Sequence, residues 1–199
     1  HGKMIRVFSM TLPGHENGLP AAKALSVWAD DFSKGIDCIG KFLDQAEQAV
    51  AFAIREKFAD PNKLAFVGLS RGGMIASHLA ARVPSCRFLL AFAPLTKLKH
   101  AKEFSELKHD PLVESFDLEQ IAPALYNRHV RLYIGNHDTR VGTKACFDFA
   151  MSLVGSAKEH KVSIPQIELF ISPSIGHMGH GTPPEIFQQG AHWIAECLK

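Results

Sequence analysis

The strongest constraint on the fold is a five-residue motif, Gly-Leu-Ser-Arg-Gly, at positions 68–72. An apolar run at 64–67 precedes it and a helix-compatible run at 74–81 follows it, so a predicted strand turns here into a predicted helix. A serine on such a turn is held in a strained conformation with its hydroxyl projecting from the sheet, and the glycines keep side chains out of the bend. This context indicates that Ser70 is a nucleophile.

The size and charge of the chain limit the classes of protein to consider. Its 199 residues are 46% hydrophobic, enough for one domain with a sizeable core, so we expect a single domain over 1–199. The 22 basic and 20 acidic side chains leave a net charge of +2, too small to imply nucleic acid or a membrane surface as the partner. The sequence indicates no oligomeric state.

The cysteines and the hydropathy of the chain indicate in which cellular compartment the protein is expected. The cysteines are far apart, have mostly apolar neighbours and form no Cys-x-x-Cys pair, which favours free thiols over disulfides. They are Cys38, Cys86, Cys146 and Cys197. No run approaches the roughly 20 apolar residues of a membrane-spanning helix, and no signal peptide opens the chain. These features predict a cytoplasmic protein.

Strand-like and helix-like segments alternate along the chain. Predicted strands cover 4–10, 64–67, 87–92, 130–134 and 167–171, and predicted helices cover 38–58, 74–81, 143–156 and 184–198. Apolar strands separated by helices indicate an α/β fold with a mostly parallel sheet and helices on both faces. Ligands of such sheets bind at the carboxyl ends of the strands. Residues 96–127 fit the alternation least well and are predicted to form a small cap or lid over the site.

A serine nucleophile needs a base within hydrogen-bond reach, and the base needs a third group to orient it. The candidate acid is Asp138, which follows the end of the predicted strand 130–134. An alternative interpretation is that Asp138 only caps the turn before the next helix. Asp110 is a weaker candidate, and Asp148 and Glu168 lie inside a predicted helix and a predicted strand.

The candidate base is His177, in the glycine-rich loop after the last predicted sheet strand. Flanking glycines let a loop carry an imidazole over the serine without steric conflict. We favour His177 because it directly follows the Ile-Gly pair that leaves the strand, and His180 in the same loop is the alternative. A metal site on these two histidines is disfavoured because no third ligand with suitable spacing is evident. We expect His78, inside the helix after the nucleophile, to be an interior histidine.

Ser70, Asp138 and His177, in this order and each after a strand, resemble the triad of the α/β-hydrolase superfamily, and the resemblance covers nearly the whole chain. Segments 60–73 and 134–141 are similar to the dienelactone-hydrolase-like and prolyl-oligopeptidase-like branches, which include esterases, lactone hydrolases and peptidases. The resemblance implies a serine hydrolase that needs no cofactor and cleaves a small ester, lactone or thioester through an acyl-enzyme.

The family mechanism assigns attack to Ser70, proton transfer to His177 and orientation of the imidazole to Asp138. One oxyanion donor is expected to be the backbone amide of Arg71, the residue after the nucleophile. Peptidase activity is less expected, because peptidases of that branch usually add a large accessory domain and 199 residues leave no room for one.

The substrate pocket is expected to involve His15, Leu69 and Met178, together with the segment 96–127. The alternative to an enzyme is a non-catalytic α/β-hydrolase scaffold that binds a ligand or partner in the same cleft.

The second oxyanion donor is not located by the sequence. In the family it comes from a loop after an early strand, often with His-Gly, and this chain offers only His1-Gly2 and Pro-Gly-His at 13–15. Residues 11–15 resemble the Pro-Gly-His after the next strand of the family, in which case the first strands precede residue 1. The alternative is that 4–10 is itself the oxyanion-loop strand; we favour the first interpretation.

Overall fold

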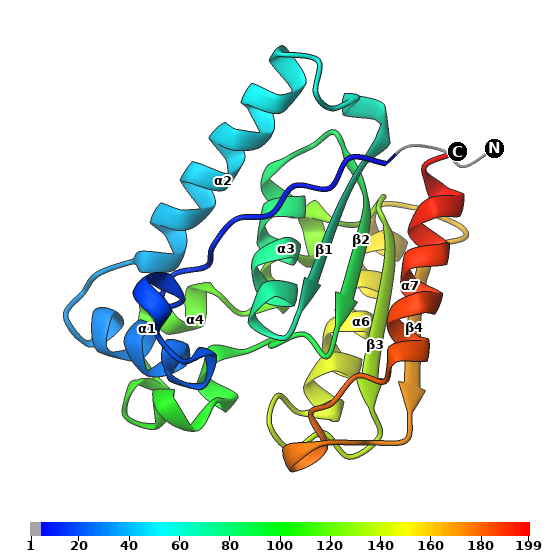
Figure 1. The fold of residues 1–199 in the computed structure, drawn as a ribbon. Helices are drawn as coiled ribbons and strands as arrows, with labels where there is room; N and C mark the ends of the chain where they lie inside the picture. The colour runs from blue at the N-terminus through cyan, green and yellow to red at the C-terminus, as the bar shows by residue number, and fades with distance from the viewer. Residues whose placement is uncertain (1–4) are drawn as a thin grey trace.

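A four-stranded parallel sheet forms the centre of the computed structural model, which describes residues 5–199 (Figure 1). The strands are β1 Leu64–Leu69, β2 Cys86–Phe92, β3 His129–Gly135 and β4 Ile167–Ser172, and they lie side by side in the order of the chain. In the register of the sheet, Leu90 of β2 lies between Val67 of β1 and Arg131 of β3. The parallel sheet and the strands predicted from 64 onward are therefore confirmed.

Helices connect the strands and cover the sheet. They are α1 Ala24–Ser33, α2 Cys38–Arg55, α3 Arg71–Arg82, α4 Pro111–Ser115, α5 Leu118–Ile121, α6 Thr143–Glu159 and α7 Pro184–Cys197. The predicted helices at 38–58, 74–81, 143–156 and 184–198 correspond to α2, α3, α6 and α7. The short helix α1 was not predicted from the sequence.

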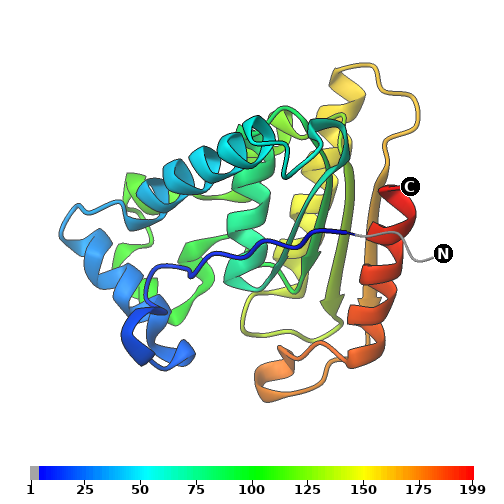
Figure 2. The same cartoon turned by 45° about the horizontal axis from the view of Figure 1, so that its top comes forward.

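The two faces of the sheet pack against different helices, as Figures 1 and 2 show. Side chains alternate along β2: Leu89 points into the larger core that α1, α2, α3 and α6 share, whereas Leu90 points to the opposite face. On that opposite face Phe92 packs with Tyr133 and with Ile194 of α7. The prediction of helices on both faces is confirmed, and burial of each large apolar side chain contributes about 1.5–3 kcal/mol to stability.

The predicted strand 4–10 is wrong for the part that the structure describes. Residues 5–10 have no regular secondary structure and cross the molecule towards α1 (dark blue in Figure 1), while Met4 lies outside the described residues. Val7 and Phe8 are 87% and 62% exposed, and the Arg6 side chain donates a hydrogen bond to the Phe58 carbonyl at 3.1 Å. Apolar character favours an extended chain here, but a strand also needs a neighbour for its N–H and C=O groups.

Strand β1 lies at one edge of the sheet. Within residues 5–199 its ladder partner is β2 alone. Ala65 of β1 packs on the α7 side, so Val67 and Leu69, two and four residues later, face the same side. These two side chains are 53% and 47% exposed, because α7 packs over β2.

The segment 96–127 folds into short helical turns, η4 Leu98–His100, η5 Lys102–Leu107 and η6 Ala122–Ala124, together with α4 and α5. Its apolar side chains belong to the main core, and Phe104 is fully buried with its ring 5.8 Å from that of Phe32 in α1. The segment is thus anchored in the core, and its role as a cap stays a prediction.

The cysteines are free thiols in the structure, as predicted, and Cys86 and Cys146 are buried. Burial raises the pKa of the Cys86 thiol to about 11 and that of Cys146 to about 12. Within residues 5–199, no helix combines the length and the apolar character that crossing a bilayer demands.

Candidate active site

Ser70 occupies the sharp turn between β1 and α3, with φ 54° and ψ −115°. The left-handed region is unfavourable for a residue with a Cβ and costs about 1–3 kcal/mol. Backbone hydrogen bonds hold the turn: Ser70 N–H donates to the Phe92 carbonyl at 2.8 Å, and Leu95 N–H donates to the Ser70 carbonyl at 3.1 Å. A Cβ at Gly68 would collide with the backbone of Gly72, which explains the first glycine of the motif. The predicted strand, sharp turn and helix around Ser70 are confirmed.

Three polar side chains form one hydrogen-bonded chain at the carboxyl end of the sheet. Ser70 Oγ lies 2.9 Å from His180 Nε2, and His180 Nδ1 lies 2.7 Å from Asp138 Oδ2. With the proton on Nδ1, the imidazole donates to the carboxylate and its Nε2 accepts from the serine hydroxyl. This is the tautomer in which a histidine can remove a proton from serine.

The structure corrects the choice between the two loop histidines, because His180 and not His177 contacts Ser70. The loop turns through η7 His177–Gly179, where His180 N–H donates to the His177 carbonyl at 3.0 Å, and His177 is left exposed. Gly176 and Gly179 have φ values of 74° and 72°, and a Cβ at Gly179 would collide with the His137 carbonyl. A glycine directly precedes each histidine, so the sequence held no signal that separates them.

Asp138 is 3% exposed and uses its two carboxylate oxygens differently. Oδ2 accepts from His180, while Oδ1 accepts from the backbone N–H groups of Arg140 and Val141, both at 3.0 Å. Asp138 therefore caps the turn through Oδ1 and contacts the histidine through Oδ2. These bonds fix the carboxylate, so the imidazole has one preferred orientation.

The other candidate carboxylates are engaged elsewhere. Asp110 caps α4 and accepts from Leu112 N–H at 2.8 Å. Asp148 pairs with a lysine on the same helix, and Glu168 forms a bidentate pair with Arg131 at 2.7 and 2.9 Å. None of the three contacts the chain of Ser70, His180 and Asp138 in the part of the molecule that the structure describes.

Arg71 follows the nucleophile as the first residue of α3. Backbone N–H groups at a helix start have no acceptor within the helix, so the Arg71 amide is available to an oxyanion. The Arg71 side chain donates to the Ala21 carbonyl at 2.7 Å. Burial, and then the nearby charge of Arg140, lower the pKa of the Arg71 guanidinium.

Two of the predicted substrate-binding residues lie on elements next to catalytic side chains. Leu69 is the last residue of β1 and Met178 lies in the η7 loop, and their side chains are 47% and 41% exposed. Burial, and then the charge of Arg71, lower the pKa of His15. Their role in substrate binding stays a proposal.

An ion pair that the sequence did not reveal joins the 96–127 segment to the turn after Asp138. Arg140 contacts Glu103 through two hydrogen bonds of 2.8 and 3.1 Å, and the two side chains are only 20% and 10% exposed. Burial of Glu103 favours its neutral form, but the hydrogen bonds from Arg140 outweigh this effect and lower the pKa of the carboxyl.

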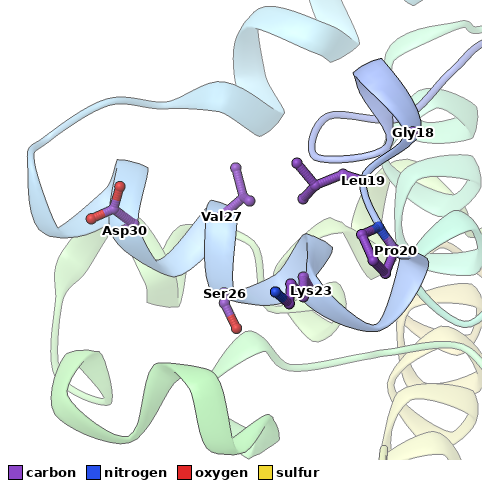
Figure 3. A pocket seen from close by; sticks show the side chains of 7 residues that line it. All are labelled: Gly18, Leu19, Pro20, Lys23, Ser26, Val27 and Asp30. Carbon is purple, nitrogen blue, oxygen red and sulfur yellow. The ribbon is translucent and has the colours of Figure 1, made fainter.

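Two further features were assessed as possible sites. A hollow of about 460 Å³ lies between the turn at 18–20 and α1 and is lined by Leu19, Lys23, Val27 and Asp30 among others. Figure 3 shows these side chains. The hollow contains none of the candidate catalytic residues. Among residues 5–199, no group of three or more His, Cys, Asp or Glu side chains could hold a metal ion.

Residues 39–199 match the prolyl oligopeptidase family, and the chain therefore belongs to this family of α/β-hydrolases. A comparison with curated proteins found no match. The family assignment agrees with the fold and with the position of Ser70 between β1 and α3.

Solved structures share the fold at low sequence identity. A protein from Bacteroides ovatus described as a dipeptidyl aminopeptidase IV aligns with a TM-score of 0.57 and 17% identity, over 73% of this chain and 20% of its own. Prolyl oligopeptidase B from Galerina marginata, bound to a macrocyclization substrate, aligns with a TM-score of 0.54 and 22% identity. The alignment covers 78% of this chain and 24% of that protein. A sugar hydrolase from Lactococcus lactis aligns with a TM-score of 0.55 and 12% identity, over 92% of this chain and 71% of its own. The chain thus spans a fifth to a quarter of the two peptidases, and the likeness establishes the α/β-hydrolase fold.

Proposed function

We propose that this protein is a serine hydrolase that cleaves a small ester, lactone or thioester through an acyl-enzyme on Ser70. The observation that supports the proposal is the continuous hydrogen-bonded chain from Ser70 Oγ through His180 to the buried carboxylate of Asp138. A serine hydroxyl becomes an effective nucleophile only when a correctly oriented base accepts its proton. The 2.9 Å contact with His180 Nε2 meets that requirement.

In the proposed reaction, Ser70 Oγ attacks the carbonyl carbon while His180 Nε2 takes the hydroxyl proton. The carbonyl oxygen becomes an oxyanion, to which the backbone N–H of Arg71 donates a hydrogen bond. His180 then gives its proton to the departing alkoxide or thiolate, and the acyl-enzyme forms. Water enters, loses a proton to His180 and attacks the acyl carbon. His180 then returns this proton to Ser70 Oγ as the acid leaves, which restores the serine hydroxyl.

Two other functions each rest on one observation. Family membership favours cleavage of a peptide bond by the same residues. A scaffold that binds without catalysis is favoured by the oxyanion site, because Arg71 supplies the one backbone donor that we assign. In that case, the ligand binds beside Ser70 without being acylated.

The experiment combines active-site labelling with turnover. A fluorophosphonate probe should label the wild type and a Ser26→Ala control, which alters an exposed serine of α1, but not Ser70→Ala. Hydrolysis of p-nitrophenyl butyrate should follow the same pattern. Labelling that persists in Ser70→Ala would identify another nucleophile.

Peptide and scaffold functions give different results in the same assays. Faster turnover of a peptide p-nitroanilide than of the ester indicates a peptidase. A folded wild type that shows neither labelling nor turnover indicates a scaffold.

A further inference from the structure

We infer that the enzyme selects esters whose acyl chain ends in a carboxylate, which a cationic cavity next to Asp138 and His180 holds by charge. The inference rests on the proposed hydrolase function and adds the substrate class. Three properties of the cavity support the inference: its position, the charges on its walls and its volume.

The cavity lies between the 96–127 segment and the loops that carry the acid and the base. It has a volume of about 610 Å³, and its lining includes Lys99, Lys102, Lys108, Thr139, Arg140 and Met178. Thr139 directly follows Asp138, and Met178 is two residues before His180. The Thr139 N–H and hydroxyl both donate to the Met178 carbonyl, at 2.9 and 3.1 Å, so the two loops form a joint wall.

The ionisable side chains on the walls are basic. Lys99, Lys102, Lys108 and Arg140 line the cavity, and no Asp or Glu is among the lining residues of the described chain. Glu103 balances the charge of Arg140 in their bidentate ion pair, so the three lysines supply the net positive charge of the cavity.

The neighbouring charges do not cancel this positive potential. Glu106 lies on the same turn as Lys102 but does not line the cavity, and accepts a hydrogen bond from Ser105 at 3.5 Å. Lys97 points elsewhere, since it pairs with Asp117 and Glu119 at 3.2 and 2.6 Å. Burial, and then the charges of Lys97 and Lys99, lower the pKa of His100, which agrees with a positive environment.

Hydrogen bonds connect the cavity wall to the nucleophile. The N–H groups of Arg140 and Val141 on the cavity wall donate to Asp138 Oδ1, Asp138 Oδ2 lies 2.7 Å from His180 Nδ1, and His180 Nε2 lies 2.9 Å from Ser70 Oγ. A substrate acylated on Ser70 would therefore extend its far end into a region of positive potential.

The volume of the cavity and the apolar side chains on its walls indicate which group links the ester to the carboxylate in the substrate. A volume of about 610 Å³ is typical of small-molecule sites. Ala101, Val141 and Met178 offer apolar surface to a short methylene chain between the ester and the carboxylate. The half-ester of a short dicarboxylic acid combines both properties.

The test compares two esters with acyl chains of equal length. Mono-p-nitrophenyl glutarate carries a terminal carboxylate, and p-nitrophenyl pentanoate does not. Single exposed charge pairs contribute little, but three lysines together should raise kcat/KM for the glutarate ester about tenfold over the neutral ester at low salt. Salt screens exposed charges, so the ratio should approach one near 0.5 M salt, on the order of a 4 Å screening length.

A pair of triple variants assigns the effect to the cavity. Lys99→Gln, Lys102→Gln and Lys108→Gln together should abolish the preference. The control replaces the exposed lysines Lys41, Lys57 and Lys158 by Gln, removes the same charge and should keep the ratio.

The outcomes separate the two proposals. A ratio near one in the wild type, or a ratio that survives in the cavity variant, overturns the inference and leaves the hydrolase proposal standing. If neither ester is turned over, the hydrolase proposal fails. Calorimetric titration of the wild type and the cavity variant with monomethyl glutarate then tests whether the cavity binds a carboxylate. Binding that only the wild type shows supports a carboxylate site, and absent or equal binding overturns it.

Discussion

The carboxylate of Asp138 holds His180 through one oxygen and its own turn through the other. Oδ2 lies 2.7 Å from His180 Nδ1, and Oδ1 accepts the N–H groups of Arg140 and Val141 at 3.0 Å. Because every one of these partners is a donor, the site requires a group that only accepts.

Replacement of Asp138 by Asn should therefore disable the base without unfolding the protein. If the amide oxygen takes the backbone N–H groups, the NH₂ group faces His180 and stabilises the wrong tautomer. We expect kcat for ester hydrolysis to fall by about 10⁴-fold, as in other triads, and circular dichroism to show a folded protein. A decrease of less than tenfold would contradict the orienting role.

The two histidines of the η7 loop should respond very differently to substitution. His180→Ala removes the group that contacts Ser70 and should lower kcat by at least about 10³-fold. His177→Ala alters an exposed side chain and should stay within about twofold of the wild type. Steady-state kinetics with one ester measures both, and the reverse ranking would restore His177 as the base.

The backbone strain at Ser70 should be measurable as stability. Glycine adopts φ 54° without the penalty that a Cβ carries. Ser70→Gly should consequently be about 1 kcal/mol more stable than Ser70→Ala in urea unfolding, while both variants lose fluorophosphonate labelling. Equal or lower stability of the glycine variant would show that the turn is not strained.

The 96–127 segment should behave as part of the core. Phe104 is fully buried against Phe32, so Phe104→Ala should lower the free energy of unfolding by about 3–5 kcal/mol. The control Phe147→Ala removes a side chain of α6 that is 46% exposed and should cost much less. Similar costs for both variants would indicate that the segment detaches readily from the core.

His78 should make stability depend on pH. Burial lowers the pKa of this histidine to about 4, and its Nε2–H donates to the Phe116 carbonyl at 3.1 Å. Between pH 6.5, the usual value, and about 4, the unfolded chain binds a proton that the folded protein does not, so stability falls as the pH falls. The loss should reach about 3 kcal/mol at the low end of this window.

The variant His78→Gln isolates this effect. Urea unfolding of wild type and variant across pH 4–7 should give a difference that changes with pH in the stated direction. A difference that is constant across the window would contradict a buried neutral histidine.

Local patterns predicted most of the sheet and the order of the site residues. Apolar runs next to helical periodicity located β1 to β4, and the Gly-x-Ser-x-Gly turn located Ser70. The choice between His177 and His180 depended on a turn of three residues with two positive φ angles, and a single sequence does not specify such a turn. The Arg140–Glu103 pair joins residues 37 apart and follows from tertiary packing alone.

The prediction of a strand at 4–10 was wrong over residues 5–10 for a related reason. Its composition favours an extended chain, and the prediction of a strand assumed that a neighbouring strand would pair with it. In the described residues the segment instead crosses the molecule with Val7 and Phe8 exposed. Pairing is a property of the whole fold, so residue propensity alone could not reveal it.

The edge of β1 also affects how the protein will behave in concentrated solution. An edge strand presents a row of N–H and C=O groups, and here Val67 and Leu69 add exposed apolar surface beside them. Such an edge can template an extended segment from another molecule. The β1 edge should therefore promote aggregation, and Val67→Lys should delay it in light scattering while fluorophosphonate labelling of Ser70 persists.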